Sequence, residues 1–328
     1  MTAVKRWTDS AHETLDGLLQ NLVAEGRLTA RYGVEATPAQ IVESSRELLL
    51  NVIERSLPLA RVMDDSHLVL RAEGTAVHVD LPRLAAFNWL SVVAERTMRH
   101  LSRQLFNLSE RASKRLGRGL DLRLTGIAPG SLYLGFSIAD VPSDLLAAAG
   151  EPVLATIRDS VRKLPDTASH IGDESILPAI HELLPDPAQR DLSLEALLAL
   201  SPTGKRGISA VHIMAPGTPS RRLSPRERLI LKEALARPEL RNRKPGAFVG
   251  SLHEIDLDTH RFQLRGVTGV GTLRCAIAPL TKAEGKALLG EWVRVEGEYE
   301  TDRQGRPRLM LVQHAVPLPS APQPSLLG

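Results

Sequence analysis

Cysteine and aromatic residues are scarce in this 328-residue chain. Cys275 is the only cysteine, which excludes an intrachain disulfide and a thiolate-rich metal site. In the segment GTLRCAIA it alternates with Leu273 and Ile277, a pattern that predicts a small core residue and not a reactive thiol. Aromatic residues make up 3% of the chain, so few rings are left for stacking on the bases of a nucleic-acid strand.

Long apolar runs are missing as well. No stretch approaches the roughly 18 apolar residues of a membrane span. The N-terminal segment MTAVKRWTDSAHETL contains charged residues from near its start, so it has no apolar core for a signal peptide. We therefore expect a cytoplasmic protein that does not enter a membrane. At 43% hydrophobic and 24% charged residues the chain is typical of globular proteins, and its length predicts two domains.

No complete catalytic motif is present in the sequence. HELLP at 181–185 has Pro185 where a zinc helix needs its second histidine, and SPTGKRG has neither the upstream glycine nor the following Ser or Thr of a phosphate loop. GVTGVG at 266–271 joins two predicted strands instead of opening a helix. We therefore expect no cofactor and no catalytic residues, which leaves an enzyme only through a constellation formed in three dimensions.

The positive charge is concentrated in one segment. Residues 1–200 hold 21 Lys and Arg against 26 Asp and Glu, residues 201–246 hold 11 against 3, and residues 247–328 hold 9 against 9. The basic segment is rich in Pro and Gly at both ends, which predicts a linker at 216–246. Ser224, Pro225 and Glu227 form a capping box that predicts one helix within it.

The last 80 or so residues read as a small β domain. GSLHEIDLDTHRFQLRG at 250–266 alternates apolar and polar residues on both sides of a turn, which predicts a hairpin. A third strand follows, then a helix with a capping box at Thr281 and Glu284, then two more strands. We expect Trp292, at the start of the fourth strand, to be buried. The order β-β-β-α-β-β over residues 247–318 resembles an OB-fold.

The same C-terminal pattern, GSLHEIDLDTHRFQLRG followed by VRVEGEYETDRQGRP, also resembles the small C-terminal barrels of uncharacterised prokaryotic proteins from toxin–antitoxin and phage-defence neighbourhoods. That resemblance implies an antitoxin-like or adaptor role. It covers under a quarter of the chain, and no family is assigned to the rest. The Pro-rich tail at 319–328 is expected to be disordered.

Residues 1–215 predict an α+β domain, so the whole chain is expected to be α+β: a mixed helix and sheet domain, a basic helical linker and an OB-like barrel. Helices are predicted after caps at Ser10 and Thr37, and a longer one within 81–117. Strands are predicted on both sides of a Pro-Gly turn in LDLRLTGIAPGSLYLGFSI and in GISAVHIMAP. Periodicity does not decide where the helices of 142–200 lie.

HLVLRAEGTAVHVDL predicts a β-hairpin that turns at Glu73 and Gly74. Its polar face would place His67 opposite Asp80, with His78 two residues away, and two histidines with a carboxylate can ligate a metal. A solvated polar face explains the same pattern, because antiparallel sheets commonly leave one face wet. We therefore expect no metal site and keep these three residues as weak candidates.

Two functions remain. In the first, the protein binds nucleic acid through the basic segment and the face of barrel strands two and three, with steep salt dependence. In the second, it is a non-catalytic protein-interaction subunit. We favour the second, because catalytic motifs and candidate exposed aromatics are both missing. The partner would be another protein subunit or nucleic acid, and the sequence does not indicate the oligomeric state. The nucleic-acid candidates are Arg221, Arg222, Arg226, Arg241, Arg243, Lys244, Arg261, Arg265 and Arg274.

Overall fold

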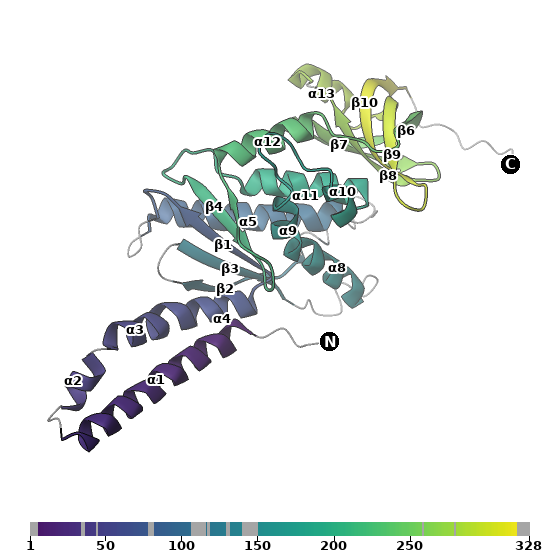
Figure 1. The fold of residues 1–328 in the computed structure, drawn as a ribbon. Helices are drawn as coiled ribbons and strands as arrows, with labels where there is room; N and C mark the ends of the chain where they lie inside the picture. The colour runs from purple at the N-terminus through teal and green to yellow at the C-terminus, as the bar shows by residue number, and fades with distance from the viewer. Residues whose placement is uncertain are drawn as a thin grey trace.

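The protein is described by a computed structural model, in which a five-stranded sheet with helices and a closed five-stranded barrel form an α+β fold (Figure 1). No helix in the described part of the chain is both long and apolar enough to cross a membrane. Residues 320–328 of the tail predicted at 319–328 lie outside that part. The structure describes residues 6–33, 37–43, 45–77, 82–105, 116, 119–128, 132–139, 150–257, 259–278 and 280–319.

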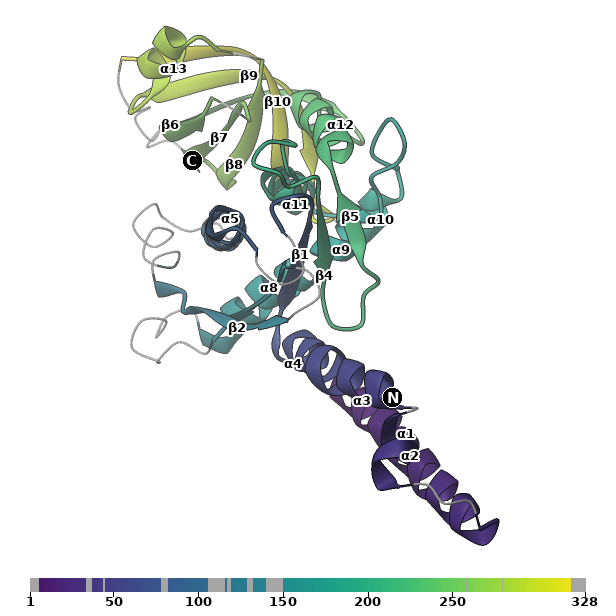
Figure 2. The same ribbon diagram turned by 90° about the vertical axis from the view of Figure 1, so that its left-hand side faces the viewer.

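The N-terminal helices form an arm that extends away from the sheet and the barrel (Figures 1 and 2). α1 runs outward, and a broken helical segment with one π-helical turn, η1, runs back to the sheet. These elements are α1 (Trp7–Arg31), α2 (Pro38–Glu43), α3 (Arg46–Asn51), η1 (Val52–Ser56) and α4 (Leu57–Asp65).

The two predicted helix caps of the arm have different outcomes. Thr37 and Gln40 exchange the expected capping hydrogen bonds, so that prediction is confirmed. The cap at Ser10 is wrong, because α1 begins three residues earlier, at Trp7. The carboxylate of Asp64, from α4, accepts hydrogen bonds from the backbone N–H groups of Trp7 and Thr8, both at 2.9 Å. A cap supplied from 56 or 57 residues away leaves no local sequence signal.

The sheet places β1 (Leu68–Glu73) at its centre, in the order β2-β3-β1-β4-β5. The hairpin predicted at 67–81 is therefore wrong, because β3 and β4 occupy both edges of β1. The remaining strands are β2 (Leu122–Ala128), β3 (Leu132–Ile138), β4 (Ala210–Met214) and β5 (Arg221–Leu223). β2 and β3 pair as predicted, and β4 is the strand expected in GISAVHIMAP.

Both faces of this sheet are covered by helices. Leu68 and Leu70 belong to the main core with residues of α5, whereas Val69, between them, packs with Val62 and Met63 of α4 on the other face. The helix predicted within 81–117 buries one apolar side, from Leu90 to Leu101, and Leu105 just after it is buried as well. α4 covers one face, and the helices that contribute to the main core on the other are α5 (Leu84–Gln104), α8 (Gly150–Arg162), α9 (Leu164–Ala168), α10 (Ile180–Leu183) and α11 (Pro187–Leu200).

The segment predicted to be a linker is folded onto the sheet domain. β5 pairs with β4, and the predicted capping box at Ser224 and Glu227 starts α12 (Pro225–Ala236). Leu223, Leu231 and Leu235 of this segment belong to the main core. Composition was misleading here, because three well-placed leucines are enough to anchor a segment whose many cations remain at the surface.

The C-terminal strands close into a barrel in the order β10-β8-β7-β6-β9, and only β8 and β10 pair in parallel. This closed, mixed five-stranded barrel is compatible with an OB-like fold. The predicted order β-β-β-α-β-β is confirmed, as is the capping box of its helix. The elements are β6 (Lys244–Asp256), β7 (Arg261–Val267), β8 (Gly271–Ile277), α13 (Lys282–Leu288), β9 (Trp292–Thr301) and β10 (Pro307–Leu318).

Closure depends on β6, which pairs with β9 up to Ser251 and with β7 from Ser251 onward. Gly250 lies at this change of partner, where a Cβ atom would come within 2.6 Å of the carbonyl oxygen of Arg265. Cys275 is buried in the barrel core as predicted, and burial raises the pKa of its thiol. Trp292 is only half-buried and is not part of that core, so our expectation for it was wrong.

Candidate functional site

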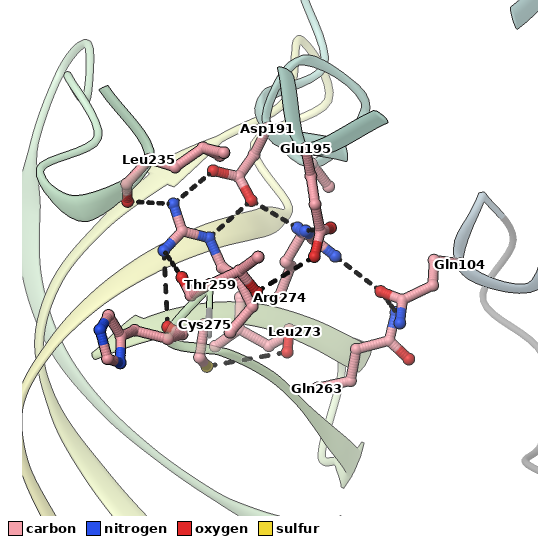
Figure 3. Close-up of polar contacts among 12 residues, drawn as sticks. Gln104, Asp191, Glu195, Leu235, Thr259, Gln263, Leu273, Arg274 and Cys275 are labelled. Carbon is pink, nitrogen blue, oxygen red and sulfur yellow. Dashed lines mark hydrogen bonds and ion pairs between the residues drawn. The ribbon is translucent and has the colours of Figure 1, made fainter. Parts of the chain in front are cut away.

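The outer face of β7 and β8 meets α11 in a buried ionic junction (Figure 3). Strand alternation sends Phe262 and Cys275 into the barrel core, so Arg261 and Arg274 lie on the outside. α11 presents Asp191 and Glu195 to this face, four residues apart and therefore on one side of the helix.

Asp191 is at the centre of the junction and binds both arginines. Its two carboxylate oxygens accept hydrogen bonds from Arg261 at 2.9 and 2.8 Å, a bidentate pair, and Arg274 Nε donates to it at 2.6 Å. Asp191 and Arg261 side chains are each 3% exposed. Arg261 also donates to the carbonyl oxygens of Leu235, Thr259 and His260, so all five of its N–H donors are used.

Glu195 extends the network toward α5. Arg274 donates to its carboxylate, His100 Nε2 lies 3.0 Å from the same oxygen, and the Thr259 hydroxyl donates to the other oxygen at 3.2 Å. The amide oxygen of Gln104 accepts from Arg274 at 2.6 Å. α5 and α11 therefore meet the barrel strands β7 and β8 in one set of charge-assisted hydrogen bonds.

Two further ion pairs join α11 to the barrel at its N-terminal end. Arg190, buried on α11, donates to Glu300 of β9 at 2.6 Å. Asp186, which caps α11, lies 3.0 Å from Arg308 of β10. The charged residues from Asp186 to Glu195 all pair with barrel residues. α11 and its cap therefore supply the ion pairs that join the sheet and its helices to the barrel.

Electrostatics favour the charged forms of these groups. Burial alone would raise the pKa of Asp191, but the charges of Arg261 and Arg274 outweigh it and hold the pKa of Asp191 below its usual value. Glu195 behaves in the same way, with burial opposed by Arg274 and His100, and its pKa is lowered. The pKa of Arg274 is raised by Glu195 and Asp191 despite its burial.

The carboxylates and guanidinium groups of this junction are paired with one another, which makes it a structural device. It also covers the face of strands two and three, on which OB-folds often bind oligonucleotides. No protein family, curated protein or solved structure matches this chain. The likeness of the barrel to an OB-fold therefore rests on its strand order and closure.

The predicted nucleic-acid residues fall into three separate places. Arg221 and Arg222 are exposed on β5, and Arg226 begins α12 and binds Asp173 at 2.6 Å. The second group, Arg241, Arg243 and Lys244, is exposed at the start of β6, beyond a helix of 12 residues that is ~18 Å long. The third group lies on the barrel face.

Within the barrel-face group, Arg261 and Arg274 form ion pairs with Asp191 and Glu195 and are buried in the junction. Arg265 is half-buried at its edge, where it lines a cavity of about 90 Å³ together with His100 and Gln104, and its Nη1 has no hydrogen-bond partner. The structure therefore does not join the nine predicted cations into one surface.

The weak metal candidates gain no support. Nδ1 of His67 accepts a hydrogen bond from the backbone N–H of Ile138 at 3.0 Å, so this nitrogen has a structural role. His78 and Asp80 lie outside the described residues. Elsewhere in the described part of the chain, no group of three or more His, Cys, Asp or Glu side chains is arranged to hold a metal ion.

Sequence reasoning missed Asp191 and Glu195 altogether. The signal was present in DLSLEALLAL, where two acids spaced by four residues interrupt an otherwise apolar segment. Such a pair on a helix that is buried on all sides needs cationic partners. Which arginines supply them could be learned only from the three-dimensional arrangement.

Proposed function

We propose that this chain is a non-catalytic protein-interaction subunit that binds its partner along the helical arm. The observation that carries the proposal is the exposure of large apolar side chains on both helical segments of the arm. Ala11 is the buried residue of α1, and Val23 is 54% exposed. The other exposed large hydrophobic side chains of the arm are Trp7, Leu19, Leu28, Tyr32, Val42, Leu48, Leu50 and Ile53.

The inner faces of the two segments already contact each other. Gly26 of α1 lies close to Ile41 of α2, and Leu18, Leu22 and Leu49 are half-buried. A pair of helices cannot cover its apolar residues alone, and contiguous exposed apolar surface marks an interaction site. Leu19 and Val23, at i and i+4, form a ridge against which another helix can pack.

Charge indicates the chemistry of the occupant. Residues 6–57 hold 5 Arg and no Lys against 8 Asp and Glu, so the arm is acidic while the whole chain has a net charge of +3. An amphipathic helix of another protein, with Lys or Arg beside its apolar stripe, complements this surface. A second copy of the same acidic arm and a nucleic acid both fit it poorly.

The context proposed for this subunit is that of an adaptor or antitoxin-like partner in a toxin–antitoxin or phage-defence system, acting in the cytoplasm. This context rests on the resemblance of the C-terminal sequence to the small barrels of such proteins, and the junction with α11 supports a scaffold role for the barrel. Genes encoding a toxin or nuclease beside this one would be expected. Neighbours of unrelated metabolism would remove the context but not the arm as a docking site.

We expect a photo-crosslinking amino acid in place of Val23 to capture one defined protein in the native cell. Leu229 is the matched control, because it is 69% exposed on α12, away from the arm.

The double variant Leu19→Glu, Val23→Glu should weaken binding of the purified partner at least tenfold, because it places charge in an apolar contact, whereas Leu229→Glu should not. Circular dichroism checks that each variant is folded. Cross-links to a second copy only, or equal capture from position 229, would contradict the proposal.

The alternative is a nucleic-acid-binding protein. It would depend on the exposed cations of β5 and the start of β6, since Arg261 and Arg274 are paired with α11. We expect no saturable binding of mixed single-stranded or duplex oligonucleotides in an anisotropy titration at about 50 mM salt, because the cations are divided between separate places. Saturable binding with a steep salt dependence would reverse the order of the two functions.

A further inference from the structure

A cavity of about 310 Å³ lies between α10, α11, α12 and β10, away from the arm. Its volume is at the lower end of the range of ~300–1,000 Å³ found for small-molecule sites. Apolar side chains from four different elements form its walls: Ile180, Leu194, Ile230 and Leu309. A small apolar body fits against these four side chains, because they offer contact area and carry no polar groups themselves.

One buried polar group in the wall has an unused hydrogen-bonding atom. His181 is 7% exposed, and its Nδ1 has no hydrogen-bond partner. Burial, with Arg190 and Arg241 nearby, lowers the pKa of His181 to about 4, so its imidazole is neutral at pH 7. Arg190 and Asp191 also line the cavity, but both are held in ion pairs with barrel residues.

The rim of the cavity is acidic. Glu174, Glu233 and Glu239 line it and are exposed, against one exposed cation, Arg237. Like-signed charges around an apolar opening raise the local concentration of the opposite charge. A cation is therefore favoured at the rim, and an anion is repelled.

We propose that this cavity is a binding site for a small organic amine. Its apolar body would lie against Ile230, Leu194 and Leu309, its ammonium group would lie at the rim beside Glu233 and Glu239, and the imidazole of His181 would lie at the buried end. This site is independent of the arm, so either proposal can fail without the other.

The test uses phenethylamine, with 3-phenylpropionate as an anion of similar shape, in calorimetric and ligand-observed NMR titrations of the full chain. We expect phenethylamine to bind with an affinity of about millimolar or tighter, as expected for a ligand of this size. We expect the anion to bind at least tenfold more weakly. No binding of phenethylamine at about 10 mM, or equal binding of the anion, would overturn the proposal.

Substitutions in the cavity wall test whether the amine binds in this cavity. Ile230→Trp should abolish binding by filling the space, whereas Leu229→Trp adds the same side chain to an exposed position on the same helix and should leave binding unchanged. Ala234→Leu is a second, smaller filling variant in case the first does not fold. The pair Glu233→Gln, Glu239→Gln should weaken amine binding about fivefold and reduce its preference over the anion. Unchanged binding in a folded filling variant would show that the amine binds elsewhere, and the proposal would be wrong.

Discussion

Replacing Asp191 with alanine is expected to destabilise the protein by about 3–5 kcal/mol. The variant leaves Arg261 and Arg274 buried without their shared carboxylate, and a buried charge without a partner is far more costly than a missing surface pair. Chemical denaturation would measure the loss. Limited proteolysis between Pro238 and Gly246 would show whether the barrel also separates from α11.

Asp173→Ala is the matched control. Asp173 lies 2.6 Å from Arg226, as close as Asp191 is to Arg274, but its side chain is 94% exposed. Surface pairs of this kind contribute about 0–1 kcal/mol, so this variant should unfold almost like the parent. A quadruple variant with Asp191→Leu, Glu195→Leu, Arg261→Met and Arg274→Met should recover much of the loss, because it removes the four paired charges together and leaves none of them without a partner. Equal stability of Asp191→Ala and Asp173→Ala would contradict a buried junction.

Acid is expected to weaken the fold in two stages, measured as the free energy of unfolding against pH. The first stage comes from His181, whose pKa burial lowers to about 4 in the folded protein, against ~6.5 in the unfolded chain. Between these values the unfolded chain binds more protons, so stability falls as the pH drops from about 6.5 to about 4. His181→Asn should remove this stage.

The second stage comes from Asp191 and Glu195, whose pKa values in the folded protein lie below their usual values because their arginine partners outweigh burial. Their contribution is complete above the unfolded pKa of ~4 and is lost as the pH falls below it. The quadruple apolar variant, which lacks both carboxylates, should lose this stage and keep the first. A pH profile in that variant identical to the parent's would contradict the role assigned to these carboxylates.

The local sequence was sufficient wherever neighbouring residues determine structure. The capping boxes at Thr281 and at Ser224 satisfy backbone donors within one turn of helix, so they could be recognised without any tertiary contact. Alternation in GTLRCAIA identified Cys275 as a core residue of a strand. The β-β-β-α-β-β order of elements along the chain followed from the same kind of signal.

Errors arose where a distant segment supplies the partner. The strand β1 was predicted, but its partners β3 and β4 come from about 65 and 140 residues further along the chain. The segment that directly follows its turn was therefore wrongly predicted to pair with it. The helix start at Trp7 depends on Asp64 in the same way. Residues 216–246 were predicted to be a linker because they are rich in cations, Pro and Gly. The composition does not show that Leu223, Leu231 and Leu235 of this segment lie in the core.

The sequence by itself therefore determined the α+β character, the β-β-β-α-β-β order and the helices of the arm, since periodicity, turns and caps act over a few residues. Only the tertiary structure decided what the charges and apolar faces do. Arg261 and Arg274 were predicted as nucleic-acid-binding cations, but in the fold Asp191 and Glu195 of α11 pair with them. Whether the apolar residues of the arm are buried or exposed likewise depends on which segments the fold brings against them. Burial and pairing are properties of segments brought together by folding, and no local pattern specifies them.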